Sequence, residues 1–121
     1  MSTLSFSHEQ LVRRAKFRTE DFEFINTRRR VHNRLGFAYQ LAFVRLANRF
    51  PTQQPFEVVE DILTFVSLQL DISADLIQDY QRRRETITEH QPQIVDYLGL
   101  RRFGETETDL LKQFLFGGVK K

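Results

Sequence analysis

The residues of this chain that are best suited to chemistry are arginines, which gather in two short runs. The first run is followed within one helical turn by histidine, asparagine and a further arginine, side chains of the types that contact phosphates or base edges. It also stands where a helix is predicted to begin, although the positive end of a helix dipole repels positive side chains. Phosphates would relieve this repulsion and would accept hydrogen bonds from the free N–H groups of the helix end. The candidate DNA-binding residues are therefore Arg28, Arg29, Arg30, His32, Asn33, Arg34, Arg82, Arg83 and Arg84.

Charge is distributed unevenly along the chain. Residues 1–50 contain ten Lys or Arg and four acids, residues 51–81 contain six acids and no base, and residues 82–121 contain eight bases and six acids. The basic patches favour a nucleic-acid partner. Two structural explanations compete with this one: the arginines form a solvated face with i,i+4 pairs, or they pair with the acidic middle segment. In addition, one of the polar residues after the first run, with Asn33 the foremost candidate, is open to interpretation as a buried structural group.

The sequence contains no signature of catalysis or of metal binding. It has no glycine-rich phosphate loop, no HExxH, no GxSxG and no cysteine. His32 and His90 each follow an arginine run and could meet in space, but two histidines without a third ligand do not predict a metal site. The carboxylates stand mainly in the first turns of predicted helices, where they suit the helix dipole. We therefore expect no catalytic residue, no metal and no cofactor.

The sequence also lacks the features of export and of membrane insertion. Its first ten residues, MSTLSFSHEQ, contain no apolar core of a signal peptide, and no run approaches 18 apolar residues. The absence of cysteine fits a reducing compartment. These observations predict a cytoplasmic protein without a membrane partner.

The elements that would position the arginines are predicted to be helices. The segment at about 29–48 has apolar residues at steps of three and four around most of its circumference, which predicts a central, buried helix. Gly36 within it indicates the close approach of another backbone, of protein or of nucleic acid. Shorter helices are expected around it at 7–16 (capped by Ser7 with Gln10), 19–25 (capped by Thr19), 56–70 (with Pro55 at its first position), 74–80 (capped by Ser73), 87–98 (ended, kinked or restarted by Pro92 and stopped by Gly99) and 106–116. The predicted fold is an all-α, compact bundle of about six or seven mostly short helices, forming a single domain over residues 1–121.

Three blocks of the sequence, in this order, resemble the class II replicative transposases (the Tn three family). They are TEDFEFINTRRRVHNRLGFAYQLAFVRLANRF at 19–50, FVSLQLDI at 65–72 and YQRRRETITEHQPQIVDYLGLRRF at 80–103. In the family the HNRLG-type helix is usually preceded by Gly-Asp, where this chain has Arg30-Val31. The Glu-His of the third block usually follows a basic pair, where this chain has Ile87-Thr88. Both differences fall in the arginine-rich stretches.

The resemblance implies a non-catalytic, α-helical N-terminal region of a bacterial transposase. In the family this region helps to bind the terminal inverted repeats of the transposon, while the acidic-triad nuclease of the DDE type lies far downstream in a much longer protein. The implied partners are double-stranded DNA at the transposon ends and the downstream domains of the same transposase.

A different function remains open, that of a protein-interaction or dimerisation module in a larger DNA-processing protein. The apolar stripe of the first helix is one candidate docking face. The other is the face of the last predicted helix, formed by Leu110, Leu111, Phe114 and Leu115.

Overall fold

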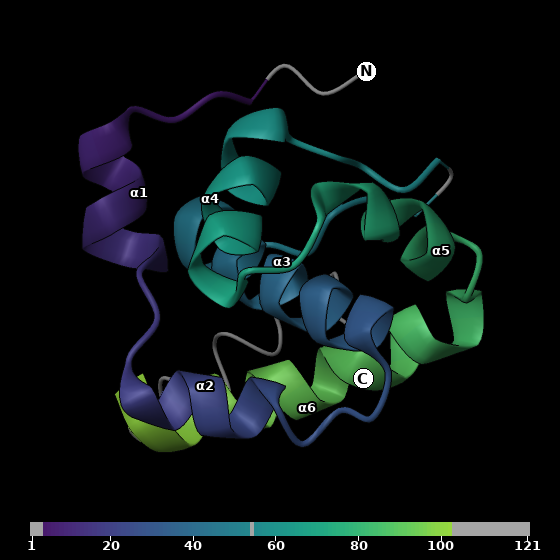
Figure 1. The fold of residues 1–121 in the computed structure, drawn as a ribbon. Coiled ribbons are helices and arrows are strands. Elements are labelled where there is room, and N and C mark those ends of the chain that lie inside the picture. Colours follow the sequence, from purple (N-terminus) through teal and green to yellow (C-terminus); the bar gives the residue numbers. More distant parts are fainter. Residues whose placement is uncertain (1–3, 54, 103–121) are drawn as a thin grey trace, which may run out of the picture.

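Helix α3, Val31–Ala47, runs through the middle of the molecule and contacts every other helix of the computed structural model (Figure 1). The structure describes residues 4–53 and 55–102. Every residue of α3 from Leu35 to Val44 is buried, because neighbours cover the helix on most sides, as its nearly continuous apolar circumference predicted. The central helix expected at about 29–48 is thus confirmed. It ends at Asn48, which takes the left-handed conformation of a helix C-cap with φ of 62°.

The other helices form an all-α bundle around α3, which confirms the predicted fold class. In Figure 1, α4 and α5 lie above α3, α2 and α6 lie below it, and α1 lies at the left. No helix within the described ranges is long and apolar enough to cross a membrane. The surrounding elements are α1 (His8–Ala15), α2 (Thr19–Ile25), α4 (Glu60–Leu70), the 3₁₀ helix η1 (Ala74–Leu76), α5 (Ile77–Gln81) and α6 (Arg84–Arg102).

Of the three predicted helix caps, two are confirmed and one is wrong. The backbone N–H of Gln10 donates to the Ser7 hydroxyl, and the side chain of Gln10 accepts from the N–H of Ser7, which makes the expected capping box of α1. Ser73 caps η1 by accepting from the N–H of Asp75. Thr19, however, is the first residue of α2 and not its cap. The N-cap is Arg18, whose backbone N–H donates to the carboxylate of Asp21 at 2.9 Å.

Helix α4 begins at Glu60, and the prediction that it begins at Pro55 and Phe56 is wrong. The hydroxyl of Tyr39 donates to the Glu57 carbonyl and accepts from the Val59 N–H, both at 2.8 Å. This buried hydroxyl holds the intervening backbone in an extended form, so the helix starts only after Val59. The partner that decides the boundary comes from α3, and local spacing does not reveal it.

Helix α6 passes through Pro92 and continues to Arg102, so neither Pro92 nor Gly99 ends it. A proline inside a helix removes one backbone hydrogen bond and crowds the preceding turn. Packing against the rest of the bundle offsets this, because Ile87, Ile94 and Leu98 are buried at helical spacing in the core. The predicted helix at 106–116, with its candidate docking face, lies outside the described residues.

The close approach expected at Gly36 is present, but it is made by a side chain and not by a backbone. The ring of Tyr80, on α5, lies directly against Gly36. A larger residue at this position of α3 would collide with the ring, so glycine sets the spacing between α3 and α5.

Candidate nucleic-acid interface

The two arginine runs, at least 52 positions apart in sequence, lie on either side of the N-terminal end of α3. The first run occupies the loop from α2 to α3, and the second occupies the junction of α5 and α6. Figure 1 shows this junction beside the first turns of α3. The environment of His32 links the two runs: burial lowers the pKa of its imidazole, and the charges of Arg83 and Arg30 lower it further, against the opposite effect of Asp79.

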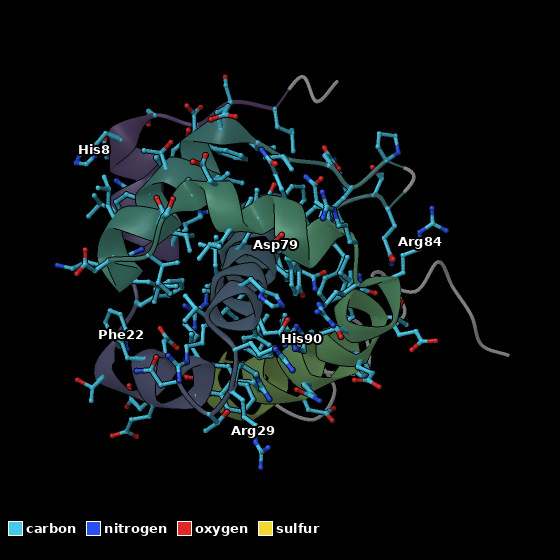
Figure 2. All side chains as sticks on the ribbon, turned by 45° about the vertical axis from the view of Figure 1, so that its right-hand side comes forward. His8, Phe22, Arg29, Asp79, Arg84 and His90 are labelled. Atoms are coloured by element: carbon cyan, nitrogen blue, oxygen red, sulfur yellow. The ribbon has the colours of Figure 1, made fainter. Side chains whose placement is uncertain are left out.

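Five of the arginines are exposed and form what we call the arginine surface: Arg29, Arg30, Arg82, Arg83 and Arg84. In Figure 2, which views α3 nearly end-on, the side chain of Arg29 points outwards at the lower edge of the molecule and that of Arg84 points outwards at the right-hand edge. None of the five forms an ion pair with any residue that the structure describes. The ion pairs of that part of the chain are Arg13–Glu9, Arg45–Asp21 and Arg49–Glu57. Pairing with acids therefore does not account for these five charges.

The first turn of α3 lies between the two runs and lacks the usual means of satisfying a helix end. Its N-cap is Arg30, which makes no side-chain capping hydrogen bond, and its first turn contains no acid. The N–H groups of a first turn have no partner inside the helix, and the helix dipole makes this end positive. Arg30, Arg83 and the first turn of α3 therefore add positive charge in the same place, around His32.

Arg28 and Arg34 differ from the other arginines, because they pack within the loop between α2 and α3. The guanidinium carbon of Arg28 lies 4.1 Å from the ring centre of Phe37 and 5.0 Å from that of Phe24. Burial lowers the pKa of Arg28, while its interaction with Tyr80 acts in the opposite direction. Nε of Arg34 donates to the Arg28 carbonyl at 2.8 Å. Both arginines thus hold the loop in shape.

His32 and Asn33 are half-buried in the first turn of α3. Nε2 of His32 and Oδ1 of Asn33 are buried, and neither has a hydrogen-bond partner among the described residues. Buried polar atoms are nearly always paired in proteins, so two unpaired atoms in successive residues mark this turn as unusual. Asn33 was also open to interpretation as a buried structural group. Its Oδ1 is indeed buried, but that atom makes no hydrogen bond that would give it a structural role among the described residues.

His90 does not belong to the arginine surface, because it is buried between α5 and α3. Its Nδ1 lies 2.7 Å from the hydroxyl oxygen of Tyr80, which also accepts from Nε2 of Gln40 at 2.8 Å. Its ring stacks on Tyr80 and meets Phe37 edge-on. Burial, followed by the nearby charge of Arg28, lowers the pKa of His90 to about 4. Across the described ranges, no three His, Asp or Glu side chains are placed to hold a metal ion.

The apolar stripe of the first helix, proposed above as a docking face, is largely covered. Leu11 and Ala15 are buried, and α1 packs against α3 and α4. Val12 alone of the stripe is exposed, at 40%. This stripe therefore serves the interior of the bundle.

A further basic group, which the sequence analysis did not single out, surrounds the short connection between α1 and α2. It consists of four bases among six residues: Arg13, Arg14, Lys16 and Arg18. The two buried residues between them, Ala15 and Phe17, interrupt the run and make it less conspicuous than three arginines in a row. A count of charge over a short window would have found it.

Comparison with known proteins places this sequence among transposases. Residues 2–118 match the model of a family described as a domain of unknown function, DUF4158. The transposase of transposon gamma-delta from Escherichia coli is 37% identical over 97 residues, which are 79% of this chain and 10% of that protein. The transposase of transposon Tn1546 from Enterococcus faecium is 33% identical over 78 residues, which are 64% of this chain and 8% of that protein.

The match is thus to one part of much larger proteins. The transposase of transposon Tn3926 from Escherichia coli follows the same pattern, with 31% identity over 78% of this chain and 10% of the transposase. The chain spans about a tenth of the length of these curated relatives. No solved structure matches it significantly. The chain therefore belongs to the DUF4158 family and corresponds to the N-terminal tenth of transposases of the Tn three family.

Proposed function

We propose that this chain is a non-catalytic DNA-binding module of a replicative transposase, which recognises the terminal inverted repeats of the transposon during transposition. The observation that carries the proposal is the arginine surface. Two distant segments carry five exposed arginines and flank the uncapped first turn of α3, where the charges of Arg30 and Arg83 both reach His32, and none of the five forms an ion pair within the described part of the chain. Unneutralised arginines in one region are the means by which proteins bind the phosphates of DNA.

Each group of residues has a distinct role in this proposal. The five arginines bind phosphates, and the first-turn N–H groups of α3 bind one more. His32 and Asn33, which are half-exposed in the first turn of α3, contribute hydrogen bonds at the same place. Arg28 and Arg34 keep the loop in the form that presents Arg29 and Arg30.

The relatives are transposases by name, and they contain about ten times the sequence matched here. Catalysis accordingly belongs to downstream domains of the DDE type in the parent protein, and this domain needs no cofactor. The partners are double-stranded DNA at the transposon ends and those downstream domains.

The test is fluorescence anisotropy with two labelled duplexes, one carrying the transposon end and one a shuffled sequence, at several salt concentrations. Tighter binding to the end at physiological salt is expected. Replacing Arg82 and Arg84 with alanine should reduce the slope of log affinity against log salt by about 1.8, since each lost phosphate contact removes about 0.9. An unchanged slope would exclude the second run from the interface.

A control variant of the same net charge distinguishes the loss of a direct phosphate contact from the effect of a lower net charge on DNA attraction. Thr64→Glu with Leu68→Glu also lowers the net charge by two, because it adds two negative side chains. Both residues are exposed on α4, and Leu68 is 75% exposed. This variant should change the slope much less than Arg82→Ala with Arg84→Ala does. Equal effects of the two variants, or equal affinity for both duplexes, would leave only non-specific attraction to a basic domain.

A further inference from the structure

A small pocket lies where α1 leads into α2, at the opposite end of α2 from the first arginine run. Its volume is about 80 Å³. Five of its lining residues are basic and two are acidic, so positive charge dominates it. The lining residues are Arg13, Arg14, Lys16, Arg18, Glu20, Asp21 and Arg45.

One of the two acids in the pocket, Asp21, is already neutralised by a buried ion pair. The two terminal nitrogens of Arg45 bind the two oxygens of Asp21 at 3.0 and 2.9 Å, and the two side chains are only 8% and 4% exposed. Asp21 also accepts hydrogen bonds from the Tyr97 hydroxyl at 2.6 Å and from the Arg18 N–H at 2.9 Å. Asp21 and Arg45 thus neutralise each other, and the remaining lining residues are four bases and the acid Glu20.

The rim of the pocket, by contrast, carries exposed bases that lack an acidic partner. Arg14, Lys16 and Arg18 are exposed, and none forms an ion pair with the described residues. Arg13 pairs with Glu9 at 2.9 Å, but both side chains are at least 70% exposed. Exposed pairs of this kind are weak, so Arg13 is able to exchange Glu9 for a ligand.

We propose that this pocket binds a phosphate group. Its volume is a few times the roughly 30 Å³ that one water occupies in the liquid, which suits a small oxyanion. Arginine matches the oxygens of phosphate with paired hydrogen bonds, and lysine adds a point charge. The phosphate comes either from the backbone of a duplex or from a small phosphate compound in solution.

The position of the pocket favours the backbone of a duplex as the source, a reading that rests on the function proposed above. Helix α2 has seven residues and is therefore about 10 Å long, at about 1.5 Å per residue. Figure 1 shows it along the lower side of the molecule, with one end near α1 and the other leading into the loop before α3. Because duplex DNA carries one charge per roughly 1.7 Å of axis, a duplex that follows α2 offers phosphates at both ends of this helix.

The experiment is a titration of the complete, ¹⁵N-labelled 121-residue chain, followed by NMR, in two arms. One arm adds inorganic phosphate against sodium chloride at constant ionic strength, and the other adds the transposon-end duplex. Saturable shifts of the backbone amides of Lys16, Phe17 and Arg18 are expected. Arg14→Gln with Lys16→Gln should weaken the binding that causes these shifts at least tenfold. Gln78→Glu with Thr88→Glu, of equal net charge and at exposed positions of α5 and α6, should leave the binding of inorganic phosphate unchanged.

The outcomes separate this proposal from the proposed function. Saturable shifts with phosphate and none with the duplex would support the pocket and identify a small phosphate compound as its ligand. Shifts with the duplex that the Arg14→Gln/Lys16→Gln variant weakens would support the pocket as a backbone contact. No saturable shift in either arm, or shifts that the variant leaves unchanged, would overturn the pocket even if anisotropy shows specific binding by the arginine surface. Conversely, phosphate binding without duplex binding would overturn the proposed function alone.

Discussion

The ring of Tyr80 lies against the backbone of Gly36 so closely that a Cβ atom on Gly36 would overlap it. Tyr80 is fully buried, and its hydroxyl is fixed by hydrogen bonds with Gln40 and His90. The ring therefore cannot easily move aside. Since Gly36 is one turn along α3 from His32, this contact also sets where the second arginine run stands relative to the first.

Gly36→Ala should destabilise the protein, although alanine is the better helix former by roughly 1 kcal/mol. The added methyl group would force the Tyr80 ring out of a close-packed site, and overpacking of this kind costs about 1–3 kcal/mol or more. We expect a lower midpoint of urea denaturation with an unchanged denaturant slope.

A double-mutant cycle with Tyr80→Ala identifies the cause. Tyr80→Ala alone should be strongly destabilising because it opens a cavity. In that background, Gly36→Ala should become neutral or stabilising, because the ring is gone and the helix propensity remains. An equal penalty for Gly36→Ala in both backgrounds would show that another contact requires the glycine.

Stability should fall as the solution is acidified from about pH 6.5 to about pH 4, because His90 is kept neutral in the folded protein. Its pKa is lowered from 6.5 to about 4, so in this range the unfolded chain binds a proton that the folded chain does not. The contribution is fully present above pH 6.5, and about 3 kcal/mol is lost by pH 4, at 1.36 kcal/mol per pKa unit. Urea denaturation at a series of pH values measures it.

His90→Asn removes the titrating group while keeping an oxygen near the position of Nδ1, where it can accept from Tyr80. The variant should be less stable at neutral pH but should show a flatter dependence on pH between 6.5 and 4. His32→Gln is the control, since its pKa is lowered in the same direction and should account for a smaller part of the slope. Asp21 acts in a lower window, because its contribution is lost only as the pH falls below about 3.8. If the stability of His90→Asn depends on pH as steeply as that of the parent chain, another group causes the loss of stability in acid.

Arg28→Gln should change mainly the stability of the domain, whereas Arg29→Gln should change mainly its affinity for DNA. The two residues are adjacent, and both substitutions remove one positive charge. Arg28 lies over Phe37 and Phe24, so its loss should reduce the free energy of unfolding by about 1 kcal/mol and leave the salt dependence of DNA affinity unchanged. Arg29 is exposed, so its loss should change stability by less than about 0.5 kcal/mol. It should instead reduce the salt slope by about 0.9. The reverse pattern would contradict the division between packing arginines and the arginine surface.

Asp21→Asn should be among the most damaging single changes in the domain. Burial alone raises the pKa of Asp21, but hydrogen bonds from Arg45, Tyr97 and the Arg18 N–H outweigh it and lower the pKa below its ordinary value. Removing this carboxylate would leave Arg45 buried without a counter-charge, which costs roughly 3–5 kcal/mol.

Adding Arg45→Met to Asp21→Asn should restore most of the lost stability, because no unpaired charge then remains buried. Thermal denaturation of the two variants beside the parent chain makes the comparison. If the double variant is no better than Asp21→Asn, the penalty comes from the hydrogen bonds of Asp21 and not from its charge.

The helices could be predicted wherever their signals are local. Ser7 with Gln10 marked the start of α1, and the apolar circumference of α3 marked a buried central helix. The start of α4 could not be predicted, because it depends on the hydroxyl of Tyr39, which lies 20 positions from Val59 in sequence. The continuation of α6 through Pro92 could not be predicted either, because it depends on the burial of residues on both sides of the proline.

The sequence predicted which residues lie in the candidate site, but not which of them pack inside the domain and which face solvent. Three consecutive arginines look alike in a sequence, yet Arg28 packs on aromatic rings while Arg29 and Arg30 face solvent. Nothing in the sequence indicated that His90, which follows an arginine run, would be buried. Its burial follows from Tyr80 and Gln40, partners that only the packing of α5 and α6 on α3 brings to it.

The hydrogen bond from Tyr97 to Asp21 joins residues 76 positions apart, and this separation bears on how the domain is made in the cell. A ribosome adds roughly 5–20 residues per second, so α2 is synthesised about 4–15 s before Tyr97 exists to hold it. During that interval Asp21 and Arg45 lack the hydrogen bond and the cover that Tyr97 supplies, so the ion pair is not yet fully buried. The bases at both ends of α2 then belong to an incompletely folded chain. Chains released before residue 97 should therefore be sensitive to proteases, and the basic surfaces take their final form only when α6 is nearly complete.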